Sequence, residues 1–191
     1  MIVVVAGVAG SGKTTIGQLL AGRLGCEFAD GDSFHPPANV AKMHAGVPLT
    51  DTDRWPWLRA MVTWMDEQAA AGKSAVVACS ALKRRYRDLL LSGSARPRMV
   101  FLVIPHDADA ARLTGRQGHF FPAKLLDSQF ADLELPQPPE PVLLVPATGT
   151  PQQTTSEVLR LLGQPGEDQP GEDQPGGEQP GGEPGGVIRG G

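Results

Sequence analysis

The residues with the clearest chemical potential form a glycine-rich loop near the N-terminus. Residues 7–14 read GVAGSGKT and match the pattern G-x-x-x-x-G-K-[ST]. Glycines let backbone N–H groups turn inward around phosphates, and a following helix adds partial positive charge at its N-terminus. In such loops the lysine reaches the β- and γ-phosphates and the hydroxyl ligates Mg²⁺. The motif therefore predicts binding of ATP with Mg²⁺ through Lys13 and Thr14. It does not identify the reaction that follows.

A pair of carboxylates follows the next strand-like segment. Asp30 and Asp32 stand two residues apart in DGDSFHP (30–36). One carboxylate at such a strand end can hold a Mg²⁺-bound water, while the other accepts the proton of an attacking hydroxyl. The alternative is a solvated turn that uses Asp and Gly for backbone reasons.

Two pairs of basic residues complete the candidate site. Lys83 and Arg87 are four apart and would share one face of a helix, which suits an anionic acceptor. Arg112 and Arg116 are also four apart and precede the glycine-containing segment QGHFFP (117–122). This arrangement fits a lid that closes over ATP, neutralises developing charge and excludes water. A solvated helix face and an ordinary surface turn are the respective alternatives.

The elements that must position these residues alternate along the chain. Apolar segments predict strands at 2–6, 26–29, 75–79, 100–104 and 142–145. Helices are predicted at 13–24, 53–71, 82–91, 107–115, 123–130 and 152–162, with Asp53 as the N-cap of the second and Trp57 as a core residue. This alternation predicts a parallel sheet covered on both faces, and ligands gather at the carboxyl ends of such strands.

The composition changes at about residue 164. From Gln164 onward the sequence repeats QPGED and QPGGE and has too few apolar side chains to offset its ordering entropy, so a disordered tail is predicted at 164–191. The tail carries six acidic residues and one arginine. The chain has a net charge of −4, which leaves +1 on residues 1–163. A nearly neutral domain argues against nucleic acid as the main partner.

The remaining features indicate an intracellular protein. Cys26 and Cys79 have neither disulfide-framework nor metal-site spacing, and we interpret them as core residues in a reducing compartment. The apolar start lacks the basic residues of a signal peptide, and no apolar run approaches the length of a membrane span. We therefore expect a cytoplasmic protein without membrane contact.

Together these segments resemble the gluconate kinase family of small P-loop kinases, in the same broad group as shikimate kinase. The matching segments keep their order, cover most of residues 1–163, and read GVAGSGKT (7–14), FADGDSFHP (28–36), NVAKMHAGVPLTDTDRWPWL (39–58), ACSALKRRYRD (78–88) and RQGHFFPAKLLDSQFADLELP (116–136). The sequence departs from the family pattern at Ala9, where serine is common, and at Gln117, where lysine is frequent.

The resemblance implies an α/β P-loop kinase fold: a five-stranded parallel sheet, helices on both faces and a helical lid at about 112–124. It also implies the conversion of ATP and D-gluconate to ADP and 6-phospho-D-gluconate, and often a homodimer. The residues carried over for ATP are Gly7, Gly10, Ser11, Gly12, Lys13, Thr14, Thr15, Arg112 and Arg116. Those carried over for the acceptor pocket are Asp30, Asp32, His35, Arg54, Lys83, Arg87 and His119.

The resemblance also suggests how the catalytic work is divided. Lys13, Asp30, Asp32 and Arg116 are the expected catalytic set. Asp32 is expected to be the base, by likeness to the Asp-x-Asp of shikimate kinase, and Asp30 to hold Mg²⁺ through water.

Three other interpretations compete with this one. The first is a related kinase for another small acid. Against a shikimate-like kinase stand the HP after DGD and the CSALK segment, because shikimate kinases resemble neither. A non-catalytic nucleotide-binding regulator would be expected to have lost Lys13, Thr14 or the Asp pair, and all are present. A tail that acts as an interaction module would need apolar anchors, which it lacks before Val187.

Overall fold

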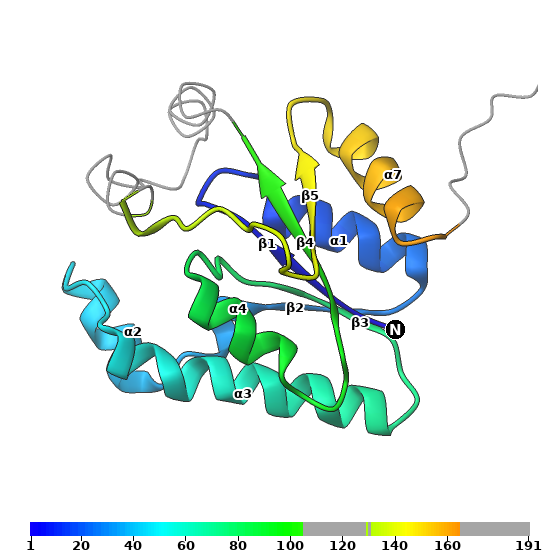
Figure 1. Ribbon diagram of the computed structural model, residues 1–191. Helices are drawn as coiled ribbons and strands as arrows, with labels where there is room; N and C mark the ends of the chain where they lie inside the picture. Colours follow the sequence, from blue (N-terminus) through cyan, green and yellow to red (C-terminus); the bar gives the residue numbers. More distant parts are fainter. Residues whose placement is uncertain (105–128, 130, 165–191) are drawn as a thin grey trace, which may run out of the picture.

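Five strands form one parallel sheet in the computed structural model, which describes residues 1–104, 129 and 131–164. The strands are β1 (Ile2–Ala6), β2 (Glu27–Asp30), β3 (Ala75–Ala78), β4 (Arg98–Val103) and β5 (Val142–Pro146), in the order β2-β3-β1-β4-β5. All four strand pairs are parallel, so their carboxyl ends meet at one edge (Figure 1). This confirms the predicted five-stranded parallel sheet.

The centre of the sheet is apolar because it is covered on both faces. All five residues of β1 and all four of β3 are buried. Val5 of β1 pairs with Ala78 on one side and Val100 on the other. Burying a valine or leucine side chain stabilises the fold by roughly 1.5–3 kcal/mol, so these central strands form a rigid support for the loops that follow them.

Helices cover both faces of the sheet. Helices α1 (Lys13–Leu24) and α7 (Pro151–Leu161) pack together on one face, and α3 (Asp51–Ala70) and α4 (Arg84–Leu91) on the other (Figure 1). A short 3₁₀ helix, η1 (Gly31–Phe34), and α2 (Pro37–His44) connect β2 to α3, and neither is predicted from the sequence.

The helix ends follow local sequence signals. Gly25 ends α1 in the left-handed conformation at φ 61°, as predicted. Thr50, and not the predicted Asp53, is the N-cap of α3. Thr50 has an extended backbone and accepts from the Asp53 N–H, while the Asp53 carboxylate accepts from the Thr50 N–H. This reciprocal capping box places Asp53 inside the first turn.

Several predictions lie outside the described residues. These are the helix at 107–115, the helix at 123–130 apart from residue 129, the lid at about 112–124 with Arg112, Arg116 and His119, and the tail at 164–191 apart from Gln164. Cys79 is buried in the core, as predicted, whereas Cys26 is half-buried and packs against the core. Among the described residues, no helix is long and apolar enough to cross a bilayer.

Candidate phosphotransfer site

The loop between β1 and α1 depends on glycine for its shape. Gly7, Gly10 and Gly12 have φ values of 141°, 81° and 92°, which residues with a Cβ rarely adopt. A Cβ on Gly7 would also lie 2.8 Å from both the Leu102 carbonyl oxygen and the Ser11 Oγ. The loop can therefore close tightly and direct backbone N–H groups inward, as a phosphate site requires.

Two side chains of this loop indicate an anion site. Ser11 is buried, and its Oγ has no hydrogen-bond partner among the residues that the structure describes. The Lys13 ammonium donates to the Val8 carbonyl at 2.7 Å, so it lies back across the loop. Thr14 is exposed in the first turn of α1, where its hydroxyl is open to a metal ion. These features fit the β- and γ-phosphates of ATP and one Mg²⁺.

A pocket of about 250 Å³ lies beside the phosphate loop. It is lined by Gly10, Ser11, Gly12, Thr15, Ile16, Ala147, Gly149, Pro151 and Thr154. The first five come from the loop and α1, and the others from the segment between β5 and α7 and the start of that helix. The pocket is thus placed to receive the part of a nucleotide that extends away from its phosphates.

The two predicted carboxylates lie at the carboxyl end of β2. Asp30 caps η1, because its Oδ1 accepts from the Asp32 N–H at 3.0 Å. Only glycine fits at position 31 between them, since a Cβ there would lie 2.3 Å from the Ala78 carbonyl oxygen. The DGD sequence therefore folds as a tight turn against β3, and this turn fixes the separation of the two carboxylates.

Asp32 has the electrostatics expected of a proton acceptor. Its side chain is accessible to solvent, yet enough protein surrounds it that desolvation, followed by the charge of Asp30, raises its pKa. The positive charge of Lys13, and that of His35 when protonated, oppose this shift. A carboxylate with a raised pKa that remains open to ligands is a better general base than an ordinary aspartate.

Trp57 supports both the carboxylate turn and His35. Its indole N–H donates to the Gly31 carbonyl at 2.6 Å, and its ring stacks on the His35 ring with centroids 4.2 Å apart. The Asn39 side chain contacts His35 Nδ1 at 3.3 Å and donates to the Asp53 carbonyl at 2.8 Å. Desolvation is the largest cause that lowers the pKa of His35. Trp57 is buried, as predicted, but it also orients the site, which its helical spacing alone does not indicate.

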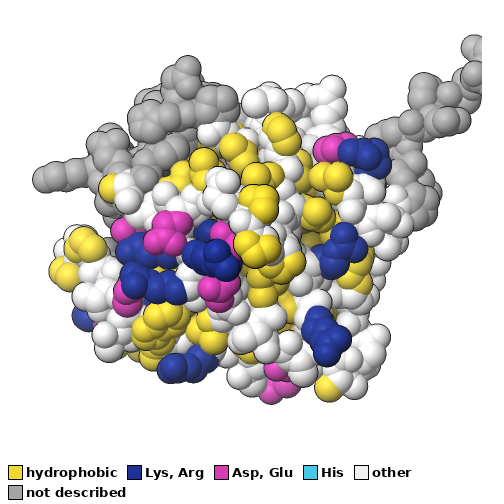
Figure 2. All heavy atoms as spheres, viewed as in Figure 1, with side chains coloured by type: hydrophobic (Ala, Val, Ile, Leu, Met, Phe, Trp, Pro, Cys, Tyr) yellow, Lys and Arg dark blue, Asp and Glu magenta, His cyan; other side chains and the backbone are white. Residues whose placement is uncertain are grey.

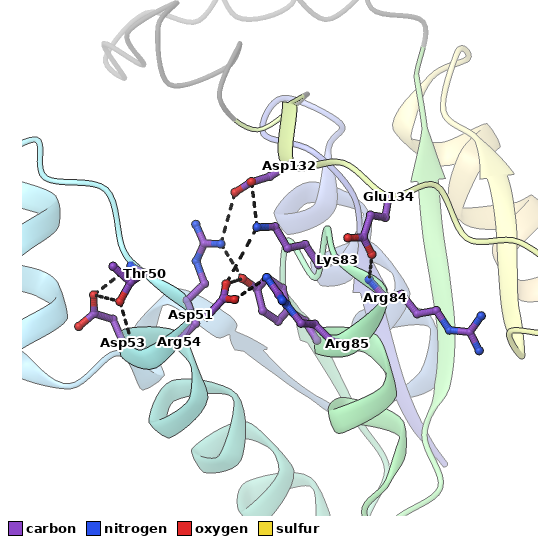
Figure 3. Close-up of polar contacts among 10 residues, drawn as sticks. Thr50, Asp51, Asp53, Arg54, Lys83, Arg84, Arg85, Asp132 and Glu134 are labelled. Carbon is purple, nitrogen blue, oxygen red and sulfur yellow. Dashed lines mark hydrogen bonds and ion pairs between the residues drawn. The ribbon is translucent and has the colours of Figure 1, made fainter.

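The predicted acceptor residues Arg54 and Lys83 meet in a network of charges (Figure 3). The Lys83 Nζ lies 3.0 Å from one Asp132 oxygen and 4.0 Å from Asp51. The Arg54 guanidinium donates to the Tyr86 hydroxyl at 2.8 Å and to Asp132 at 3.4 Å. Both basic side chains are only partly exposed, which strengthens their attraction for an anion.

The acidic residues of this network are Asp51 and Asp132. Asp51, in the first turn of α3, pairs with Arg85 and accepts from the Tyr86 hydroxyl. That hydrogen bond is the largest cause that lowers the pKa of Asp51. Figure 2 shows that basic and acidic side chains intermingle on this face around the start of α4. The network therefore holds Arg54 and Lys83 in place before any ligand binds.

The structure corrects the prediction for Arg87. Its side chain is fully buried and forms an ion pair with Glu140, so it does not share an acceptor-facing surface with Lys83. The reason is that Lys83 precedes α4 with an extended backbone, at φ −94° and ψ 144°. The four-residue helical spacing assumed for Lys83 and Arg87 therefore does not apply.

Several residues of the site are not singled out by the sequence. Asp51, Tyr86, Asp132 and Gln129 belong to segments that match the family, but nothing in their spacing predicts their pairing. Gln129 accepts from the Ala9 N–H at 2.7 Å through its side-chain carbonyl, which connects the phosphate loop to a residue 120 positions later. Only the folded chain brings such residues together.

The sheet order, the phosphate loop and the adjoining carboxylates define a P-loop kinase for a small acceptor. The family model for shikimate kinase matches residues 9–127. The gluconokinase of Gluconobacter oxydans is 48% identical over 157 residues, which cover 82% of this chain and 88% of the relative. The chain therefore belongs to the gluconokinase family, within the shikimate kinase group.

Solved structures agree with this assignment. An unliganded sugar kinase from Janibacter sp. HTCC2649 has 47% identity and a TM-score of 0.79, with 85% of this chain and 94% of that chain covered. A gluconokinase from Sinorhizobium meliloti 1021 has 41% identity and a TM-score of 0.74, with 84% and 90% covered.

Proposed function

We propose that the protein transfers the γ-phosphoryl group of ATP to O6 of D-gluconate, giving ADP and 6-phospho-D-gluconate. The observation that carries the proposal is the proximity of three parts: a phosphate loop, a carboxylate with a raised pKa at the neighbouring strand end, and partly buried basic side chains beyond it. Relatives named gluconokinase, which span most of the chain, support the choice of acceptor.

On the donor side, backbone N–H groups of residues 7–15 would hold the phosphates of ATP. Lys13 would leave the Val8 carbonyl and move to the β- and γ-phosphates. Mg²⁺, when bound, neutralises phosphate charge; the Thr14 hydroxyl would ligate it directly and Asp30 would hold it through water. The loop thus fixes the phosphoryl group in line with the acceptor.

On the acceptor side, Asp32 would accept the proton of the O6 hydroxyl as that oxygen attacks phosphorus. The acid end of the substrate would pair with Lys83 and Arg54 and replace Asp132 as their partner. His35 would frame the pocket from its stack on Trp57. Glucose would be a poor acceptor because it lacks the carboxylate.

Arg112, Arg116 and His119, which lie outside the described residues, complete the proposal. The two arginines would neutralise charge on the transferring group, and His119 would contact the acceptor. Cytoplasmic location and a homodimeric state also stay predictions.

The proposal is tested by incubating the enzyme with Mg-ATP and either D-gluconate, shikimate, glucose or AMP, and by identifying products with phosphorus NMR. We expect 6-phosphogluconate from gluconate and little product from the others. A preference for shikimate or another acid would favour a related kinase of the same fold. ATP binding without turnover of any acceptor would favour a nucleotide-binding regulator.

A further inference from the structure

A buried ion pair lies behind the loop that carries Lys83. Arg87 on α4 and Glu140, just before β5, have side chains 0% and 4% exposed. The Arg87 Nε lies 2.8 Å from one Glu140 oxygen, and its Nη2 lies 3.1 Å from the other. This two-point contact fixes the plane of the guanidinium, and it lowers the pKa of Glu140.

The third nitrogen of Arg87 holds the loop itself. Its Nη1 donates to the Ala81 carbonyl at 3.2 Å and to the Leu82 carbonyl at 2.8 Å, directly before Lys83. Ala81 has a φ of 42°, in the left-handed region that alanine rarely occupies. A backbone in this region persists only where its surroundings hold it, and Arg87 is the charged group that does so.

The same loop joins the donor and acceptor sides of the site. The Ser80 carbonyl accepts from the Gly7 N–H at 3.3 Å, at the start of the phosphate loop. The Leu82 carbonyl also accepts from the Glu134 N–H at 3.0 Å, two residues after Asp132. The direction of the Lys83 side chain thus depends on the strained backbone at Ala81, which the buried guanidinium of Arg87 holds in place.

We propose that Arg87 and Glu140 are positioning residues for the acceptor site: Arg87 fixes the loop from which Lys83 reaches the acid end of the substrate, and Glu140 fixes Arg87. Neither residue touches substrate. The inference rests on the proposed function, in which Lys83 binds the acceptor. A pair that served stability alone would change the melting temperature and leave the kinetics of the folded enzyme unaltered.

The test uses two variants that keep both charges. In Arg87→Lys, an ammonium on a single stem cannot reach both Glu140 oxygens and both carbonyls. In Glu140→Asp, the shorter side chain pulls the guanidinium away from the loop. We expect each to raise the KM for D-gluconate about ten-fold, to lower kcat less, and to leave the KM for ATP within about two-fold.

Two controls separate positioning from stability. Arg160→Lys makes the same change in an exposed pair with Glu157, and we expect no change in either KM. Val158→Ala removes buried methyl groups from α7, away from the loop, and we expect a lower melting temperature with an unchanged KM for gluconate. All assays are run at one temperature at which every variant is folded, as circular dichroism verifies.

The inference is overturned if both charge-keeping variants behave like Val158→Ala, or if the KM for ATP rises as much as that for gluconate. If only one of the two variants folds, its KM values alone support or overturn the inference. Failure of the proposed function is seen separately, in the wild-type enzyme. If the wild type prefers another acid, the same comparison of KM values is made with that acid.

Discussion

The donor and acceptor sides of this site are built in different ways. The phosphate-binding part of the donor side is one continuous loop, shaped by glycines at positive φ and attached to the fully buried strand β1. The acceptor side is made of side chains from the end of β2, the first turns of α3, the loop before α4 and the segment around Asp132. Backbone groups hold the donor, whereas paired charges hold the acceptor.

This difference determines which side of the site sets substrate specificity. A backbone site recognises phosphate in any nucleotide and depends little on individual side chains beyond Lys13 and Thr14. A side-chain site can be changed at single positions, and its partly buried charges are sensitive to small displacements. We therefore expect donor-side variants to abolish catalysis and acceptor-side variants to change selectivity, pH dependence or affinity.

The largest expected effect is at Lys13. Lys13→Ala removes the ammonium that would stabilise charge on the transferring phosphoryl group, so turnover should fall roughly a hundred-fold or more. Cooperative thermal unfolding should persist, because Lys13 is outside the apolar core. Turnover and unfolding are measured on one sample. Turnover within a few-fold of wild type would show that the loop does not clamp the phosphates through this residue.

Asp32→Asn should break the acceptor side at the proton-transfer step. The amide cannot accept the O6 proton, so kcat should fall roughly 10²–10⁴-fold while the KM for gluconate changes only a few-fold. Steady-state kinetics with varied gluconate separate the two parameters. A large rise in KM with kcat preserved would make Asp32 a binding residue, and Asp30 would become the candidate base.

The electrostatic coupling of the two carboxylates should appear in the pH profile. Asp32 acts as a base only when it is deprotonated, and its pKa is raised. The value of kcat/KM should therefore decline, as pH falls, at a higher pH than an ordinary aspartate would give. Asp30→Asn removes one cause of the raised pKa, so the acidic limb should move to lower pH.

The measurement is made at saturating Mg²⁺ in both enzymes. His35 also titrates beside Asp32, with a lowered pKa, so His35→Gln is the control for its contribution. An acidic limb that moves with His35→Gln and not with Asp30→Asn would assign the limb to the histidine.

The smallest expected effect concerns the tail. Deleting residues 164–191 removes a segment almost without apolar side chains, so melting temperature and kinetics should stay unchanged. Thermal unfolding and steady-state kinetics of the two chains give the comparison. A loss of several degrees, or a large rise in either KM, would show that the tail docks on the kinase domain.

The sequence predicts the donor side well because the information is local. The buried strand, the glycine pattern and the helix of residues 13–24 are contiguous, and the structure reproduces them within a residue or so. The central strands are equally predictable, since β1 and β3 are short, buried apolar runs. Boundaries differ where side chains decide them, as when Thr50 caps α3 in place of Asp53.

The acceptor side is less predictable because its contacts span the chain. The spacing from Lys83 assigns Arg87 to the pocket, but its partner Glu140 is 53 residues away. Nor does any local pattern predict that Asp132 lies beside Arg54 and Lys83. Trp57 has the spacing of a core residue, and its hydrogen bond to Gly31 emerges only from packing.

Recognition of the acid group is the property that tests the proposed acceptor site most directly. The kcat/KM values of D-gluconate and its neutral amide, D-gluconamide, are compared in wild type and in Lys83→Met. Lys42→Met is the matched control, because Lys42 pairs with Asp53 and not with the acceptor network. We predict that wild type and the control prefer gluconate strongly, and that Lys83→Met loses about ten-fold or more of that preference. An unchanged preference in Lys83→Met would contradict an acceptor site built on paired charges.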